Sequence, residues 1–280
     1  MSFNNLIKAI CENNENAVSG LINQDYINKT TMNGFTPLLI SIIKKHTNIT
    51  RLLLNASDNT GIDINKREEK NKCGPLYIAA QVGNIDIVEL LIQRNADINL
   101  CNFEGDHALI ISVNLGHFDI AKLLIDSGAD INHCDHANAN ALYFASQNGY
   151  LNIVELLIQS ASFNLDFNIF NSRTSANPLL AASKNGHIDI VKLLIQNGSD
   201  VNVYNFEGDT ALIMASIMGN FDIAKLLIDS GADINYINNS GDSALSYAAK
   251  NNHFNIVELL YHKMEYVVVI QADTEIAKNG

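Results

Sequence analysis

Phe118-Asp-Ile-Ala-Lys-Leu-Leu-Ile-Asp-Ser-Gly-Ala-Asp-Ile-Asn132 is a stretch of fifteen residues that returns unchanged as residues 221–235. The two copies are offset by 103 residues, and chance does not produce an identity of this length. The chain therefore contains an internal duplication. Duplication at a fixed spacing is typical of repeat proteins, in which each unit buries its apolar face against its neighbours.

A shorter pattern divides the chain into seven consecutive units. A small residue followed by leucine recurs with gaps of 38, 33, 33, 37, 33 and 33 residues, at Pro37-Leu38, Pro75-Leu76, Ala108-Leu109, Ala141-Leu142, Pro178-Leu179, Ala211-Leu212 and Ala244-Leu245. These pairs predict seven repeats over residues 33–262, starting near residues 31, 69, 102, 135, 172, 205 and 238. Two units are longer than the others, and we expect their inserted loops at 55–61 and 160–166.

The unit around residue 210 illustrates the local pattern. Gly208 supplies the positive φ of a tight turn, and Thr210 is a natural N-cap for a short helix over 211–217. Gly219 breaks that helix. A second helix is predicted over 222–228, because its apolar residues recur at the spacing of one helical face.

This pattern resembles the ankyrin repeat, which has one turn and two helices in a period of about 33 residues. Thr36-Pro37-Leu38 matches the family's Thr-Pro-Leu signature, and Gly-Ala-Asp-Ile-Asn occurs at 128–132 and 231–235. The resemblance implies an all-α ankyrin-repeat solenoid, a curved stack of helix-turn-helix units joined by β-hairpin-like turns. Four positions where the family has glycine differ, and we expect distorted turns at Lys72, Asn138, Ser175 and Asn252.

The two ends differ from the repeats. Residues 1–32 are predicted to form an N-terminal helical capping repeat, because their apolar residues follow helical spacing and the opposite face is rich in Asn and Glu. Residues 263–280 are predicted to be a C-terminal cap or tail. Either they cover the open end as a last helix or strand, or the solenoid continues into a further domain.

Composition restricts the classes of partner. The formal net charge of −12 disfavours nucleic acid and anionic membranes, so we expect neither as a partner. Four scattered cysteines in 280 residues suit a reducing compartment, and no segment is long and apolar enough to span a membrane. We expect an intracellular monomer, in the cytoplasm or delivered into a host cytoplasm. The Asn- and Ile-rich composition resembles ankyrin proteins of intracellular bacteria, giant viruses or protists.

Candidate chemical groups are few. His133, Cys134, Asp135 and His136 form the most metal-like cluster, with Cys101 at the matching position one repeat earlier. Neighbouring turn tips are expected to be too far apart to supply the four ligands of a zinc site. We therefore expect no metal and no cofactor.

Four histidines could be imagined as general bases, but no nucleophile stands at a matched spacing. They are His107, which takes the place of the helix-capping Thr, and His117, His187 and His253. We therefore expect no enzymatic activity within the repeats. The recurring Asp130, Asp200 and Asp233 are expected to bind backbone N–H groups in the turns.

The predicted partner-binding surface consists of residues that packing does not explain. Its apolar members are Phe103, Tyr204, Phe206 and Tyr236 at or beside the turn tips, and Val82, Leu115, Ile217 and Met218 on the first-helix face. Its acidic members are Glu104, Asp106, Glu207 and Asp209, with Asp242 on the same ridge. Such a surface fits a basic, partly apolar segment of another protein. In the alternative interpretation, the two phenylalanines fold back onto the neighbouring turn.

These observations favour a non-enzymatic protein–protein interaction scaffold that binds its partner through the turn tips and the concave first-helix face. One alternative is a targeting module of a larger effector or enzyme with its catalytic part beyond residue 280. Another is a substrate or decoy of an asparagine hydroxylase, whose motif matches at Asn99, Asn132, Asn202 and Asn235. Leu123, Leu124, Leu226 and Leu227 are expected in the second-helix core.

Overall fold

The computed structural model describes residues 2–56, 61–161 and 165–264. Within these ranges the regular structure is helical, with two isolated antiparallel bridges, Tyr204 with Thr210 and Ile237 with Ser243. The chain forms two compact units. The first contains residues 1–141 with 155–165, and the second contains 142–154 with the residues from 166 onward.

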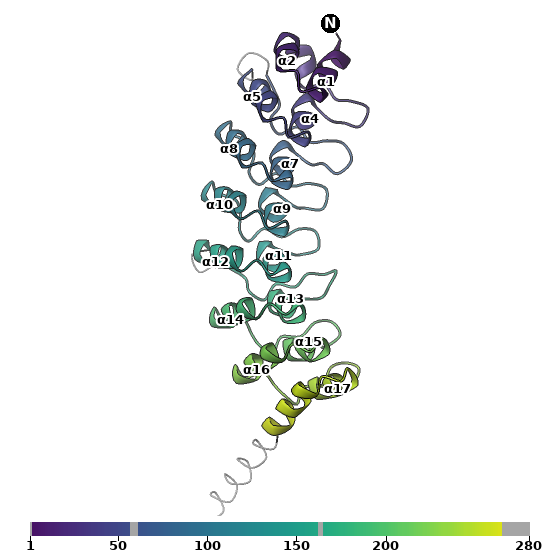
Figure 1. Ribbon diagram of the computed structural model, residues 1–280, viewed down its shortest axis with the longest axis vertical. Coiled ribbons are helices and arrows are strands. Elements are labelled where there is room, and N and C mark those ends of the chain that lie inside the picture. The colour runs from purple at the N-terminus through teal and green to yellow at the C-terminus, as the bar shows by residue number, and fades with distance from the viewer. Residues whose placement is uncertain (1, 57–60, 162–164, 265–280) are drawn as a thin grey trace, which may run out of the picture. The chain divides into compact units, whose positions relative to one another are not determined.

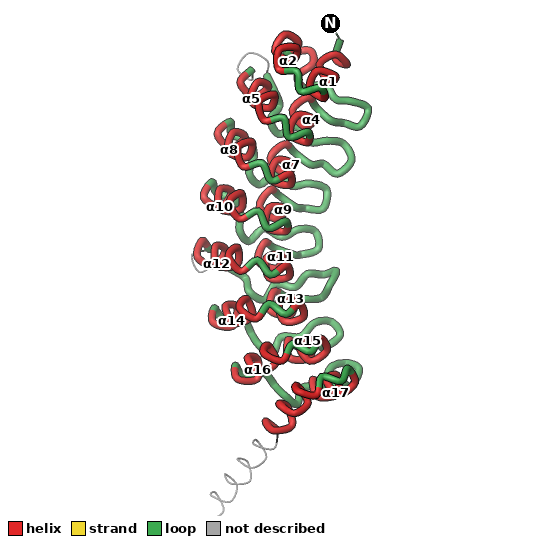
Figure 2. Tube along the Cα trace, in the orientation of Figure 1, coloured by secondary structure: helices red, strands yellow, loops and turns green. Residues whose placement is uncertain are grey.

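In the first unit the helices lie in two columns (Figure 1). The inner column, which contains the first helix of each repeat, is α4, α7 and α9, and the second helices α5, α8 and α10 form the other. The helices are α1 (Phe3–Cys11), α2 (Glu15–Leu21), α3 (Gln24–Ile27), α4 (Pro37–Ile43), α5 (Thr47–Asn55), α7 (Pro75–Val82), α8 (Ile85–Gln93), α9 (Ala108–Asn114) and α10 (Phe118–Asp126). The loops preceding α4, α7 and α9 project to the same side (Figure 2).

The second unit repeats this arrangement, with α13 packed on α15 and α15 on α17, while α14 contacts α16. Its helices are α13 (Pro178–Asn185), α14 (Ile188–Gln196), α15 (Ala211–Met218), α16 (Phe221–Asp229) and α17 (Ala244–Lys250). Residues 254–264 are also helical. Two further helices, α11 (Ala141–Asn148) and α12 (Leu151–Ser160), include the residues at which the chain passes between the units.

Capping residues start and stop the helices as the pattern predicts. The Thr36 hydroxyl accepts a hydrogen bond from the Leu39 N–H at 3.2 Å, and Pro37 occupies the first position of α4. Thr210 caps α15 in the same way, and Gly219 ends that helix with a φ of 76°.

The residues that replace glycine adopt its left-handed conformation, but the expectation of distorted turns is confirmed at Lys72 and Ser175. These two turns close between Glu68 N–H and the Cys73 carbonyl and between Asn171 N–H and the Ala176 carbonyl, one residue longer than the turn between Asn205 N–H and the Asp209 carbonyl. Lys72, Asn138 and Ser175 adopt φ values of 59°, 59° and 50°, and Asn252, in the turn between the helices, adopts 62°. An L-residue can occupy this left-handed region at a cost of about 1–2 kcal/mol, and asparagine does so most readily. The hydrogen bonds of the turn hold these residues in place: the Glu68 N–H donates to the Cys73 carbonyl at 3.0 Å across the turn that contains Lys72.

The core runs along the contact between the two columns of helices. Leu124 of α10 and Leu227 of α16 are fully buried, as predicted. Leu123 and Leu226 are only half-buried, so they lie at the margin of the core and not inside it. In both of these identical helices, only the second of the two adjacent leucines is fully buried.

At the N-terminal end, α1 packs on α4 and α2 on α5. The buried side chains of this contact are Leu6, Ile10, Val18 and Ile27, which join Ile49 and Leu53 in one apolar cluster. The apolar face that the sequence shows in residues 1–32 therefore covers the first helices of the stack.

Polar contacts join each repeat to the next. The Asp130 N–H donates to Asn99 Oδ1 at 3.0 Å in the first unit, and the Asp233 N–H donates to Asn202 Oδ1 at 2.8 Å in the second. The same aspartates accept a hydrogen bond within their own turn, from Asn132 N–H and Asn235 N–H. Their predicted role as acceptors of backbone N–H groups is confirmed.

Candidate interaction surface

Two of the long turns expose a phenylalanine at the tip, and the residue before it closes the turn. Asn205 is buried, and its Oδ1 accepts a hydrogen bond from the Asp209 N–H at 2.7 Å, which closes the turn. Asn102 does the same in the first unit, where it accepts from the Asp106 N–H at 2.9 Å. Phe103 and Phe206, which follow these asparagines, are 65% and 70% exposed. Neither ring is covered by the neighbouring turn.

A second group of exposed apolar residues lies beside the Phe206 tip. The rings of Tyr204 and Tyr236 stack with their centroids 5.7 Å apart and their planes at 23°. Tyr204 is 55% exposed, and Ile237, next to Tyr236, is 59% exposed. Sequence reasoning missed Ile237. The available signal was its position, because Ile237 occupies the place in its repeat that Tyr204 occupies one repeat earlier.

The acidic side chains do not form the continuous ridge that the sequence suggested. Glu104 and Glu207 are exposed and Asp106 is half-buried, but Asp209 is buried. Asp209 Oδ1 accepts a hydrogen bond from Asn238 Nδ2 at 2.6 Å, so this carboxylate supports the next turn. The placement of Asp209 on the exposed ridge was therefore wrong.

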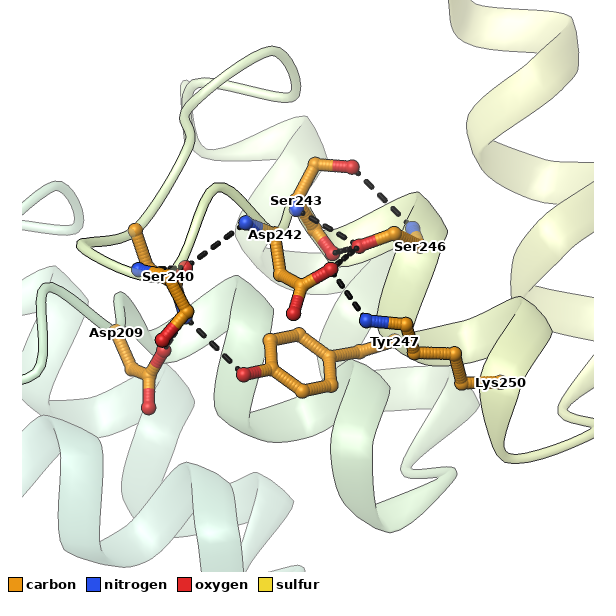
Figure 3. A network of polar contacts seen from close by, with 8 residues as sticks. Asp209, Ser240, Asp242, Ser243, Ser246, Tyr247 and Lys250 are labelled. Atoms are coloured by element: carbon orange, nitrogen blue, oxygen red, sulfur yellow. Dashed lines mark hydrogen bonds and ion pairs between the residues drawn. The ribbon is translucent and has the colours of Figure 1, made fainter.

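Asp242 is also engaged, as Figure 3 shows. Its Oδ1 accepts hydrogen bonds from Lys250 Nζ at 2.5 Å and from the Ser246 hydroxyl at 3.0 Å. The ammonium group of Lys250 holds the pKa of Asp242 below its usual range. In the same network Asn238 Nδ2 lies 3.2 Å from the Tyr247 hydroxyl. This network fixes the last long turn onto α17.

On the first-helix face, the predicted residues differ in exposure. Leu115 and Met218, at the ends of α9 and α15, are 43% and 50% exposed. Val82 and Ile217 are half-buried. The carbonyl of Ile217 accepts a hydrogen bond from His253 Nε2 at 3.1 Å, so His253 acts as a tie between consecutive repeats. His187 makes the equivalent bond to the Gln147 carbonyl at 3.2 Å.

Cysteine and histidine side chains come together in the first unit, contrary to the expectation that neighbouring tips are too far apart. Cys101 Sγ lies 3.4 Å from His133 Nε2, and the rings of His133 and His107 are 4.5 Å apart. These two turns approach closely because consecutive repeats are joined tip to tip: the His136 N–H donates to the Glu104 carbonyl at 2.8 Å. Within the described residues, no three Cys, His, Asp or Glu side chains are arranged to hold a metal ion.

His107 serves as the N-cap of α9, as its position predicted. Its Nδ1 accepts a hydrogen bond from the Ile110 N–H at 3.3 Å, and its Nε2 lies 3.1 Å from the Asp130 carbonyl. This arrangement assigns the proton to Nε2 and leaves the ring neutral. Burial is the main reason why the pKa of His107 is lowered.

The thiols of this region are weakly nucleophilic. Burial, with Glu68 and Asp106 nearby, raises the pKa of Cys73 to about 11, and burial also raises the pKa of Cys101. Both groups are therefore protonated at neutral pH, whereas nucleophilic catalysis and metal binding need the thiolate.

The candidate hydroxylation sites are Asn99, Asn132, Asn202 and Asn235, and all four are exposed. Asn99 and Asn202 accept the hydrogen bonds between repeats described above, and Asn202 Nδ2 also donates to the Gly231 carbonyl at 3.2 Å. Hydroxylation of these residues stays a prediction, and an enzyme would have to open the contact between two repeats to reach Asn202.

No helix in the described part of the chain combines the length and apolarity needed to cross a membrane.

A search of curated proteins gives no match. A family model for ankyrin repeats (three copies) matches residues 6–102, 76–171, 109–205 and 179–271. Together with the paired helices, the long turns and the ties between repeats, this match shows that the chain belongs to the ankyrin-repeat family.

Proposed function

We propose that this chain is a non-enzymatic interaction module that binds a basic, partly apolar segment of another protein inside a cell. Ankyrin repeats generally mediate protein–protein interactions and are typically non-catalytic. Each unit offers its turn tips and the ends of its first helices to a partner. Phe103 and Glu104 supply the apolar and charged contacts in the first unit, and Phe206, Met218 and Glu207 supply them in the second.

The observation that carries this proposal is the exposure of Phe103 and Phe206. At 65% and 70% exposure, each ring contributes little to folding, since most of its surface stays in water. Aromatic residues are enriched at protein–protein contacts relative to ordinary surface. The hydrogen bonds of Asn102 and Asn205 hold the two rings in position before a partner arrives, which lowers the entropic cost of binding.

An affinity pull-down from eukaryotic cell lysate, read by mass spectrometry, tests the proposal. The wild type is compared with a Phe103→Ala, Phe206→Ala, Met218→Glu variant whose helical content is checked by circular dichroism. The matched control is Ile85→Ala, Ile188→Ala, which removes exposed apolar side chains at the start of two second helices.

We expect a protein that the wild type and the control retain and the surface variant loses. Proteins retained equally by all three would contradict the choice of surface. The absence of any specific partner across lysates would contradict the binding function itself.

A further inference from the structure

We propose that the two turns at residues 198–210 and 231–243 form a site for an extended protein segment in which an arginine and an apolar residue lie two positions apart. This inference rests on the proposed function and assigns the ligand chemistry of one part of the surface. The site is named here the second-unit turn surface, and it consists of Tyr204, Phe206, Tyr236 and Ile237.

The backbone of these turns explains why Tyr204 and Phe206 point outward. Tyr204 pairs with Thr210, and Ile237 pairs with Ser243, in isolated antiparallel bridges. Side chains alternate along such extended backbone. Tyr204 and Phe206 are therefore exposed on one side, whereas Asn205 between them is buried.

The two turns are also fixed to each other. The Asn239 N–H donates to the Glu207 carbonyl at 3.1 Å, and Asn239 Nδ2 donates to the Phe206 carbonyl at 2.9 Å. Asp209 and Asn238 add a buried hydrogen bond beneath them. The stacked rings of Tyr204 and Tyr236 are thus a preformed platform, which binds a partner at a lower entropic cost than a mobile loop.

Because the chain is duplicated, residues at matching positions of the two copies can be compared. The comparison shows which side chains the fold itself requires. The matching positions in the first unit carry Cys101 for Tyr204, His133 for Tyr236 and Cys134 for Ile237. The second helix between the two turns is identical in both copies, α10 at residues 118–126 and α16 at residues 221–229. A cysteine and a histidine therefore satisfy the fold at these positions, and the aromatic and aliphatic bulk of the second unit has no counterpart in the packing.

The charge of the two turns favours a cation in the ligand. Residues 198–210 and 231–243 contain Asp200, Glu207, Asp209, Asp233 and Asp242, with no lysine or arginine among them. Lys250 of α17 pairs with Asp242, and Asp209 is buried against Asn238. Glu207 is exposed and accepts a hydrogen bond from the Ser175 hydroxyl. Arginine fits better than lysine, because a planar guanidinium stacks flat on a tyrosine ring while its fork of N–H groups pairs with a carboxylate.

An apolar side chain near that arginine is needed to cover the rest of the surface. Phe206 and Ile237 are 70% and 59% exposed and carry no charge. An extended segment rises about 3.3 Å per residue and alternates its side chains, so side chains two positions apart face the same side. Such a segment can place an arginine over the tyrosine pair and an apolar side chain, two positions away, on Ile237 or Phe206.

Selection from a library of random 12-residue peptides displayed on phage tests the site, with the full chain as bait. The swap variant Tyr204→Cys, Tyr236→His, Ile237→Cys serves for counter-selection in reducing buffer, since its three new residues are those that the first unit tolerates. Selected peptides are synthesised, and their affinities are measured by fluorescence anisotropy in low and high salt. Phe206→Ala is the second variant. Its control is Ile188→Ala, which removes an exposed apolar side chain of α14, outside the proposed surface.

We expect the selected peptides to contain an arginine and an apolar residue two positions apart. The swap variant and Phe206→Ala should each weaken binding by about tenfold or more, as removal of a central interface aromatic does. Ile188→Ala should leave the affinity unchanged, and high salt should weaken the affinity because the Glu207 carboxylate is exposed to solvent.

Several outcomes would overturn the site. They are selected peptides without basic residues, affinities that the swap variant and Phe206→Ala leave unaltered, or a library from which nothing is retained. Each of them leaves the pull-down result standing, so the ligand chemistry can fail while the binding function survives. Loss of every specific partner in the pull-down would instead remove the proposed function.

Discussion

At the scale of single residues, the buried His107 makes the first unit sensitive to acid. Its Nδ1 accepts the hydrogen bond that starts α9, and protonation of that nitrogen would abolish the cap. The pKa of His107 is lowered in the folded state. As the pH falls, this side chain is therefore protonated in the unfolded chain, at its ordinary pKa of about 6.5, before it is protonated in the folded chain. The stabilisation is thus complete above about pH 6.5 and is lost as the pH falls below it. The neighbouring titratable groups are His133 and Asp130.

We therefore predict that His107→Thr makes the free energy of unfolding less dependent on pH below about pH 6.5. Threonine is the residue that the duplicated repeat carries at position 210, where it caps α15 without a titratable ring. Urea unfolding at pH 5, 6 and 7 measures the effect, and the free energy of unfolding of the variant should fall less between pH 7 and pH 5 than that of the wild type. Parallel profiles for the two proteins would contradict this.

Alanine substitutions at two glycines distinguish the cost of backbone strain from the cost of a steric contact. Gly208 and Gly231 have φ values of 80° and 92°, so alanine is strained at either position. A Cβ on Gly208 would also lie 2.9 Å from the Asn239 nitrogen, whereas a Cβ on Gly231 would meet nothing within 4 Å. We predict a loss of about 1–2 kcal/mol for Gly231→Ala and a larger loss for Gly208→Ala, measured by urea unfolding. Equal losses would show that the two turns are not held together as described.

At the scale of the helix, adjacent leucines should differ in their effect on stability. Leu124 is fully buried in α10, and its replacement by alanine should cost about 2–5 kcal/mol because a cavity is left. Leu123→Ala should cost clearly less, since Leu123 is half-buried. The same order should hold for Leu227 and Leu226 of the identical α16. Similar free energies of unfolding for the two variants would place both side chains in the core.

The helices and turns could be predicted largely from the sequence because local rules determine them. Thr36 and Thr210 are caps, and the small-residue-leucine pairs mark the buried start of each first helix. The distorted turns at Lys72 and Ser175 could be predicted from the missing glycine. The positive φ of these two residues could not, because it depends on the hydrogen bonds that close the turns. The half-burial of Leu123 was also missed. Helical spacing predicts which face of a helix is buried, but not which residues lie at the edge of that face.

The candidate surface could be predicted only in part, for a related reason. The exposure of Phe103 and Phe206 follows from their place after a turn asparagine, and the sequence indicated it. The burial of Asp209 depends on Asn238, which lies one repeat further along the chain, and the contact of Cys101 with His133 also joins two repeats. Contacts of this kind depend on how two repeats pack, which the pattern within a single repeat does not encode.

At the scale of the whole molecule, destabilisation should stay near the altered repeat. Each repeat contacts its neighbours, so stability is a sum of local terms and not one global property. We predict that Leu227→Ala accelerates amide hydrogen exchange in α14 to α17 and leaves exchange in α1 to α5 unchanged, as measured by mass spectrometry. Uniform acceleration over the chain would show a single cooperative fold.

The hydrogen bonds between repeats have a direction, and this bears on how such a chain evolves. In each pair the earlier repeat supplies the Asn acceptor and the later repeat supplies the Asp N–H, as Asn99 does for Asp130 and Asn202 for Asp233. A block of whole repeats inserted in frame carries an acceptor at its trailing edge and a donor at its leading edge. It can therefore join its new neighbours without compensating mutations. A protein lengthened by duplication of whole repeats can therefore fold without further mutations. Its exposed turns can then change in sequence and acquire new ligands.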